Sequence, residues 1–227
     1  MTSLGMPAFV RVVETATCSR MGSGKSDDGS SMRQPHENKR FDFVGNAEHT
    51  YQSFPELGQV KGARDCAQRI RLFDPLDFTG RSVLDLGCNL GGMLFEARRL
   101  GATRLTGVEC EPALIERAEA ISVSHGAGIR FICADIEDIF ATEMLDAHYD
   151  TILLLAVLYT SPFRDRNKLL AQIAQRCDVL YIEGHHGQEF AWYFNLMEWN
   201  TDFTTFRMMG RSTDQERIDR PLMRLSR

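Results

Sequence analysis

Acidic residues end three successive apolar runs, and a glycine-containing turn follows the first of them. The run at 83–86 (VLDL) leads into GCNLGG at 87–92, with Asp85 just before the turn. Glycines let the backbone pass close beneath a ligand. A carboxylate there suits an ammonium group and repels the pyrophosphate that dinucleotide sites place over such a turn. Glu109 ends the second run, where it could bind ribose hydroxyls, and Asp135 ends the third, where it could bind an adenine amine.

A second group of reactive residues follows the fourth and fifth apolar runs. Tyr159 follows the run at 149–158, and His185 and His186 follow the run at 179–183. Histidine titrates near neutrality, so the pair is a candidate to accept a proton or to hold a substrate oxygen. Ordinary loop histidines are the alternative. Because no carboxylate at helical spacing completes a ligand set, we expect no metal.

The segments that must position these residues alternate between strand and helix. Strands are predicted at 81–86, 105–109, 129–135, 149–158 and 179–183, and helices at 91–100, 112–123, 136–140, 165–176 and 188–199. Two strand-like segments, 204–209 and 221–226, close the chain with no helix between them. The alternation predicts a doubly wound α/β fold with a mostly parallel seven-stranded sheet and an antiparallel C-terminal hairpin. Ligands should bind beyond the carboxyl ends of its strands.

Length and composition suit one sizeable domain with a tail. The chain has 227 residues, of which 43% are hydrophobic and 25% charged. Eight of the thirteen residues at 19–31 are Ser or Gly, so we expect residues 1–40 to form a flexible segment. An accessory or lid region at 41–78 should follow, with a helical stretch at 51–73. Residues 79–227 form the predicted main domain.

Charge and cysteine usage narrow the partners and the compartment. The net charge of −5 disfavours a dedicated nucleic-acid binder. No apolar run reaches the ~18–20 residues of a membrane helix, and the N-terminus lacks the pattern of a secretory signal. The six cysteines form no CxxC pair, which indicates free thiols in a reducing compartment. We therefore expect a cytoplasmic protein with a small-molecule partner, and the oligomeric state stays open.

Four segments in register resemble the class I S-adenosylmethionine-dependent methyltransferases. They are VLDLGCNLGG, TGVE, CADIED and YDTILLLAVLY, and the resemblance covers about residues 80–200. The terminal strand pair fits the same Rossmann-like fold. Asn89 stands where the family's turn usually has glycine, and asparagine tolerates a left-handed backbone. The resemblance implies S-adenosylmethionine as cofactor.

The resemblance also implies a set of cofactor contacts. The methionine part would lie along Gly87, Cys88, Asn89 and Gly91, with Asp85 toward its amino group, Glu109 at the ribose, and Asp135 and Ile136 beside the adenine; Cys110 and Leu155 complete the set. Tyr51 is a candidate to close over the methionine. One of Arg64, Arg69 and Arg71 is a candidate for its carboxylate, which a guanidinium fork matches. Asp135 also has a purely structural interpretation as a helix cap.

Three function classes follow from these features. Methyl transfer to a nitrogen or oxygen of a small molecule is favoured by the size and acidic charge of the chain, with His185, His186 and Tyr159 as catalytic candidates. An RNA- or protein-modifying methyltransferase is the alternative, and arginines at 207, 211, 217, 220 and 224 could meet phosphates, although acidic residues interrupt them. A nicotinamide-dependent oxidoreductase is disfavoured by Asp85 and by Asn89 in the turn.

The aromatic run at 190–194 has two interpretations. Together with Trp199 and Phe203 it could line a substrate pocket, since aromatic side chains suit planar or amphipathic ligands. Alternatively, it belongs to a helix packed on the sheet.

Overall fold

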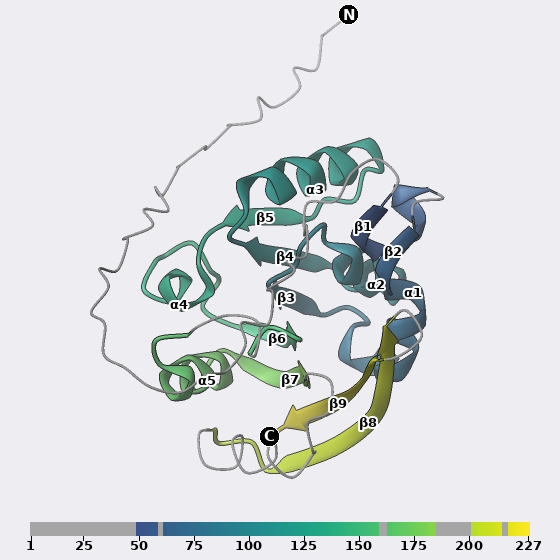
Figure 1. Ribbon diagram of the computed structural model, residues 1–227. Coiled ribbons are helices and arrows are strands. Elements are labelled where there is room, and N and C mark those ends of the chain that lie inside the picture. The colour runs from purple at the N-terminus through teal and green to yellow at the C-terminus, as the bar shows by residue number, and fades with distance from the viewer. Residues whose placement is uncertain (1–48, 59–60, 159–162, 185–200, 215–217) are drawn as a thin grey trace, which may run out of the picture.

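A mostly parallel sheet with helices on both faces forms the body of the protein (Figure 1). The computed structural model describes residues 49–58, 61–158, 163–184, 201–214 and 218–227. The strands are β1 (His49–Ser53), β2 (Lys61–Asp65), β3 (Ser82–Leu86), β4 (Arg104–Glu109), β5 (Arg130–Cys133), β6 (Tyr149–Leu155), β7 (Cys177–Glu183), β8 (Thr205–Asp214) and β9 (Ile218–Ser226). The α-helices are α1 (Cys66–Arg69), α2 (Gly92–Arg99), α3 (Pro112–Ser124), α4 (Ile136–Ile139) and α5 (Arg166–Ala174).

The strand order places a topological switch point between β3 and β6. In the described residues, the large sheet has the order β5-β4-β3-β6-β7-β9-β8. Its first five strands are mutually parallel, whereas β9 runs antiparallel to both β7 and β8. The chain moves outward from β3 to β5 on one side and returns to continue with β6 on the other. Ligands of such sheets bind at the carboxyl ends of the strands beside this switch.

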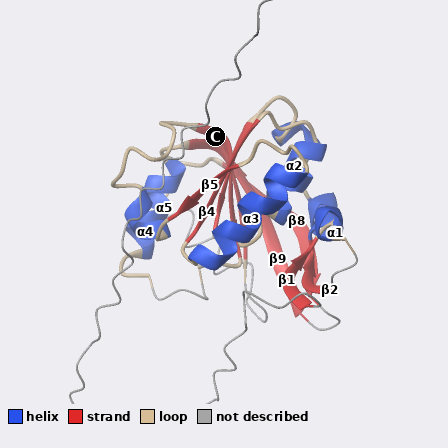
Figure 2. Ribbon diagram, turned by 90° about the horizontal axis from the view of Figure 1, so that it is seen from above, coloured by secondary structure: helices blue, strands red, loops and turns tan. Residues whose placement is uncertain are grey.

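Two apolar cores cover the two faces of the sheet. Figure 2 shows α4 and α5 on one side of the strands and α1, α2 and α3 on the other. Successive strand residues alternate between these cores. Leu84 packs in the core beneath α4 and α5, whereas Val83 packs in the core beneath α1, α2 and α3. This alternation is the normal consequence of the two-residue period of a strand. Both faces are therefore apolar, which explains the continuous hydrophobic runs.

The predicted fold class is confirmed. The mostly parallel seven-stranded sheet and its antiparallel C-terminal pair are both present in the described residues. Both strands of that pair extend further than the sequence suggested, since β8 and β9 contain ten and nine residues. The predicted helix at 188–199 lies outside the described residues.

The helix predicted at 51–73 is wrong. The segment instead contains the parallel pair β1 and β2, 3₁₀ turns at Pro55–Leu57 and Ile70–Leu72, and the four-residue helix α1. Gly58 adopts a left-handed φ of 71°, which ends the turn. Gly62 in β2 packs directly against the backbone of Gln52 and Ser53, where no side chain would fit. Asp65 then starts α1 by accepting a hydrogen bond from the backbone N–H of Gln68 at 3.1 Å.

A buried ion pair fastens the C-terminal strand to the segment that enters β3. Arg224 of β9 donates to Asp77 through Nε at 2.6 Å and through Nη2 at 2.8 Å. The hydroxyl of Tyr181 in β7 donates to the same carboxylate at 2.6 Å. Asp77 is only 9% exposed, so its charge depends on these partners rather than on water. The 3₁₀ turn Pro75–Asp77 is thereby held against β7 and β9.

Breaking this ion pair should destabilise the fold. In Arg224→Met, the Asp77 carboxylate stays buried without its cation, and we expect the free energy of unfolding to fall by about 3 kcal/mol. Arg207→Met is the matched control, because Arg207 is the exposed register partner of Arg224 on β8 and should change stability by about 0.5 kcal/mol or less. Urea denaturation measures both. Equal effects of the two substitutions would contradict a special role for the Asp77–Arg224 pair.

Candidate active site

Three left-handed residues shape the turn between β3 and α2. Gly87, Asn89 and Gly91 have φ angles of 78°, 53° and 79°. The backbone N–H groups of Gly87 and Cys88 both donate to the carbonyl of Val108 in β4, at 2.8 and 3.0 Å. The turn is therefore fixed to the neighbouring strand by main-chain bonds. Asparagine at the central position takes the left-handed conformation in place of glycine, as the sequence predicted.

Close packing requires the two outer glycines of this turn. A Cβ on Gly91 would lie 2.7 Å from the ring of Phe131, and one on Gly87 would lie 2.7 Å from Val157 Cγ2. The second contact joins the turn after β3 to the segment after β6. The two sides of the switch point are thus in direct contact.

The Glu109 carboxylate lies at the end of β4, beside this turn. Its Oε2 atom accepts a hydrogen bond from the backbone N–H of Asn89 at 3.1 Å. Its Oε1 atom accepts from the backbone N–H groups of Cys110 and Glu111 at 2.8 and 3.2 Å. These donors fix the position of the carboxylate at the sheet edge, and Cys110 next to it is exposed.

Asp85 is buried in β3, one residue before the end of the strand. It is 2% exposed, and burial raises the pKa of its carboxyl to about 7; nearby Arg69 opposes the rise and Glu109 adds to it. A buried carboxyl of this kind becomes a good anion only when a cation reaches it. It is therefore suited to a positively charged ligand group.

Asp135 starts helix α4, as its alternative interpretation predicted. Its Oδ1 atom accepts a hydrogen bond from the backbone N–H of Glu137 at 2.7 Å. The side chain is exposed at the end of the β5 edge, and Ile136 behind it is buried. Leu155, the last residue of β6, is also buried. Contacts of these residues with a ligand stay predictions.

The chain leaves β6 through a strained residue that the sequence did not reveal. Ala156 has a φ of 63°, which is unfavourable for a residue with a Cβ. Its N–H donates to the carbonyl of Glu183 in β7 at 3.1 Å. Backbone strain of this kind is concentrated at functional sites, and here it lies beside the switch point.

A buried ion cluster joins the accessory region to the end of β7. Glu183 is fully buried and accepts from Arg64 Nη2 at 2.8 Å and from Arg69 Nε at 2.9 Å. Ser212 of β8 donates to the same carboxylate at 2.5 Å. Burial favours a higher pKa for Glu183, but Arg69 and Arg64 outweigh it and hold this pKa below its usual range. Glu183 therefore stays charged in the core.

The cluster changes the interpretation of the three candidate arginines. Arg64 Nη2 is committed to Glu183 and to the Ser212 hydroxyl at 3.0 Å, so this part of the guanidinium is not available to a ligand carboxylate. Arg69 binds Glu183 through two nitrogens, and Arg71 is exposed. A cofactor contact of Arg64 stays a prediction that would have to use the rest of its guanidinium. Tyr51 in β1 is half-buried beside Arg64 and Arg69.

Gln52 is a site residue that the sequence analysis missed. This β1 residue is 3% exposed, and its Oε1 atom accepts from the backbone N–H of Gly92 at 3.0 Å. Its Nε2 group donates to the carbonyl of Cys88 at 3.1 Å. One side chain thus bridges the turn and the first residue of α2. No local pattern could have identified it, because its partners are 36 and 40 residues away.

Several predicted site residues cannot be placed. Tyr159, His185, His186, the aromatic run at 190–194 and Trp199 lie outside the described residues. Phe203 is described and packs in the core, and its role in a pocket wall stays a prediction. It is 5% exposed and belongs to the core on the α4 and α5 face.

Comparisons with known proteins agree with this geometry. Residues 83–178 match a family model described as a methyltransferase domain. The chain is 23% identical over 115 residues to the ribosomal protein L11 methyltransferase of Tolumonas auensis, covering 51% of this chain and 37% of that protein. It therefore spans little more than a third of that relative's length.

Solved structures share the fold. The bifunctional kinase-methyltransferase WbdD superposes with a TM-score of 0.62 at 23% identity, over 78% of this chain and 43% of that one. Magnesium protoporphyrin IX methyltransferase from Synechocystis PCC 6803 superposes with a TM-score of 0.58 at 19% identity, over 71% of this chain and 78% of that one. Residues 83–178 are therefore similar to a methyltransferase domain, and the sheet has the Rossmann-like fold of these S-adenosylmethionine-dependent methyltransferases.

The chemistry of the carboxyl edge of this methyltransferase domain fits the family's cofactor. Glu109 offers a positioned carboxylate at the end of β4, and the buried Asp85 carboxyl lies on the neighbouring strand β3. These groups would bind hydroxyls and cations but repel phosphates. The turn that follows Asp85 contains three left-handed residues, of which Gly87 and Gly91 carry no Cβ.

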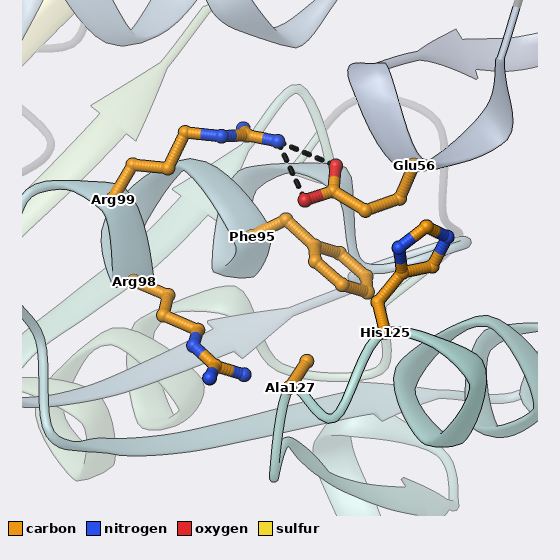
Figure 3. A pocket seen from close by; sticks show the side chains of 6 residues that line it. All are labelled: Glu56, Phe95, Arg98, Arg99, His125 and Ala127. Atoms are coloured by element: carbon orange, nitrogen blue, oxygen red, sulfur yellow. Dashed lines mark hydrogen bonds and ion pairs between the residues drawn. The ribbon is translucent and has the colours of Figure 1, made fainter.

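A separate surface depression lies at the other end of α2. Its volume is about 320 Å³, and it is lined by Glu56, Phe95, Arg98, Arg99, His125 and Ala127 (Figure 3). Arg99 is paired with Glu56, and Arg98 donates to the carbonyl of Gly126 at 2.7 Å. Arg99 is thus already ion-paired and Arg98 already hydrogen-bonded, so we assign no cofactor role to this depression.

The raised pKa of Asp85 should be visible in the stability of the domain. Asp85 keeps its proton up to about pH 7 in the folded state, whereas its ordinary pKa is 3.8. Between these values the folded state binds more protons than the unfolded state, so this group lowers stability as pH rises. Relative to wild type, Asp85→Asn should therefore gain up to about 4 kcal/mol between about pH 4 and pH 7.5.

Urea denaturation across that pH range measures this difference. Asp178→Asn is the matched control, because Asp178 is exposed at the start of β7, away from the carboxyl edge, and should show no such gain. A stability difference between Asp85→Asn and wild type that does not change with pH would show that Asp85 is ionised in the folded protein at all these pH values.

Proposed function

We propose that the protein transfers a methyl group from S-adenosylmethionine to a nitrogen or oxygen atom of a small-molecule acceptor. The observation that carries this proposal is the pair of carboxyl groups, Asp85 and Glu109, on either side of a left-handed turn at the topological switch point. The position suits a nucleoside, and the charge suits a cation.

Different residues at the carboxyl edge bind different parts of the cofactor. Glu109 binds the ribose hydroxyls, because its carboxylate is fixed at the edge by three backbone N–H groups. Asp85 faces the amino group of the methionine part. The turn residues Gly87, Cys88, Asn89 and Gly91 lie along the same part. Asp135 and Ile136 flank the adenine, with Cys110 and Leu155 nearby and Tyr51 closing over the methionine.

The protein's task in this reaction is mainly one of alignment. When bound, S-adenosylmethionine supplies an electrophilic methyl group on a positively charged sulfur. The domain must hold the acceptor atom in line with the bond that breaks and exclude water, which lowers the entropic part of the barrier. His185 and His186 are the proposed proton acceptors, with Tyr159 to orient the acceptor. A hydroxyl acceptor needs such a base more than a neutral amine does.

The described surface offers little support for a nucleic-acid acceptor. The arginines that could meet phosphates do not form one exposed group, since Arg220 is buried and Arg224 is paired with Asp77. Exposed arginines at 207 and 211 remain, on a chain of net charge −5. A small neutral or cationic acceptor suits this balance better than a polyanion.

A protein acceptor is the second candidate. The similarity to ribosomal protein L11 methyltransferase covers half of this chain, which favours this alternative over an RNA acceptor. The similar region includes only part of that enzyme.

The proposal extends to the accessory region, the extent of the catalytic domain and the cellular compartment. Residues 41–78 act as an accessory cover for the cofactor, since β1 and α1 lie against the turn and the end of β7. Residues 79–227 form the proposed catalytic domain, whereas residues 1–40 lie outside the described residues. We place the enzyme in the cytoplasm, because the five cysteines that are described are free thiols. No described helix is both long enough and apolar enough to cross a membrane.

Release of S-adenosylhomocysteine tests the proposed function. Wild-type protein is incubated with S-adenosylmethionine and panels of small amines, small hydroxyl compounds and ribosomal proteins. We expect release with members of a small-molecule panel. Glu109→Gln should weaken cofactor binding measured by calorimetry by about tenfold or more, because a charged hydrogen-bond acceptor is lost. Release only with the protein panel would favour the second candidate, and absence of any cofactor binding would overturn both.

His185→Ala tests the proposed base. We expect kcat to fall by about 10²–10⁴-fold with cofactor affinity unchanged, because a general base acts in the chemical step. His148→Ala is the control, since His148 is exposed beside Asp178. Turnover that stays at the wild-type level in His185→Ala would remove this residue from the mechanism.

A further inference from the structure

Gln52 occupies the place where phosphate-binding folds hold their ligand. In those folds, the free N–H groups at the start of the helix after the first strand bind a pyrophosphate, helped by the helix dipole. Here the first N–H of α2, that of Gly92, donates to Gln52 Oε1 at 3.0 Å. The side chain comes from β1, outside the βα unit, and is almost fully buried.

The orientation of the Gln52 amide is determined by its partners. The N–H of Gly92 can only donate, so it requires the amide oxygen, and the carbonyl of Cys88 can only accept, so it requires the amide nitrogen. Both demands are met at once. The side chain therefore fixes the distance between the turn and the helix start as well as filling the space.

The surrounding groups close the same site to an anion. The N–H of Asn89, within the turn, already donates to the Glu109 carboxylate. A Cβ placed on Gly92 would lie 2.6 Å from Cys66 Sγ and 2.7 Å from Phe54 Cδ1, so the accessory region also fills the space beside the helix start. Asp85 adds a carboxyl on the neighbouring strand.

We propose that Gln52 is a positioning residue that sets the cofactor selectivity of the turn. Its amide holds Cys88 and Gly92 in the geometry that accepts the methionine part of a sulfonium nucleoside. It also satisfies the N–H group that a pyrophosphate would need. This inference rests on the proposed cofactor. It means that a residue outside the glycine-containing motif makes the site prefer S-adenosylmethionine over phosphate-bearing nucleotides.

Two ligands that share adenosine isolate this discrimination. S-adenosylhomocysteine carries the amino-acid part beyond the ribose, whereas ADP carries a pyrophosphate there. The ratio of their dissociation constants therefore reports only on the group that meets the turn. Calorimetry measures both constants for the full-length protein, and thermal unfolding of each variant reports on stability separately.

Gln52→Ala should lower the ratio of the ADP dissociation constant to the S-adenosylhomocysteine dissociation constant by about tenfold or more. It removes both hydrogen bonds to the turn, which weakens S-adenosylhomocysteine binding by about tenfold. It also exposes the Gly92 N–H, so ADP binding should stay constant or tighten. Gln52→Glu keeps the acceptor for Gly92 but loses the donor to the Cys88 carbonyl and adds a negative charge. Both ligands should therefore bind more weakly than to wild type, and ADP most of all because its pyrophosphate is repelled, so the ratio of the ADP constant to the S-adenosylhomocysteine constant should exceed that of wild type.

The matched control is Gln175→Ala, at an exposed position just after α5, which should change neither constant. Equal weakening of both ligands in Gln52→Ala, or a ratio that narrows equally in Gln52→Glu, would overturn the inference and leave Gln52 a purely structural role. If Gln52→Ala does not fold, the Glu variant decides alone. A wild-type protein that fails to bind S-adenosylhomocysteine would instead overturn the proposed function and, with it, this inference.

Discussion

The arrangement of the site depends on one buried carboxylate, that of Glu183. It binds two guanidinium groups that lie 114 and 119 residues earlier in the chain and a hydroxyl 29 residues later. Charges cannot remain in a protein core unless they are paired and hydrogen-bonded. The accessory region, β7 and β8 must therefore meet at this point for any of these groups to be buried. The cluster fixes the relative position of these segments, which also share an apolar core in which the Phe73 and Tyr181 rings lie 4.4 Å apart.

The Glu183 ion cluster also affects the carboxyl edge of β3, where the cofactor is proposed to bind. Arg64 and Arg69 belong to β2 and α1, so their attachment to Glu183 also sets the position of the adjacent strand β1. From β1, Gln52 reaches the turn after β3. Arg69 also lowers the pKa of Asp85 against the effect of burial. Charge compensation at the end of β7 thus affects both the geometry at the end of β3, two strands away, and the proton affinity of Asp85 there.

Local signals made the sheet and the turn predictable, whereas the accessory region could not be predicted. The apolar runs, Pro112 at the start of α3 and the glycines of the turn each act within a few residues of their own position. In contrast, Arg64 and Arg69 alternate with Cys66 and Ile70 as they would on a solvated helix, and only the distant Glu183 explains their burial. For a similar reason the sequence left two interpretations of Phe203 open, because an aromatic residue near a pocket and one in the core look alike in sequence.

The left-handed Ala156 separates the geometry of the sheet edge from the sequence of the segment that follows β6. Its backbone turns the chain sharply out of the sheet, anchored by the N–H bond to Glu183 and by Val157 against Gly87. The exit point is therefore set by main-chain geometry and not by whatever side chains come later. Under the proposed function, substitutions in the sequence after Leu158 would change acceptor preference while the edge formed by the turn and Glu109 stays intact, which gives this scaffold a built-in modularity.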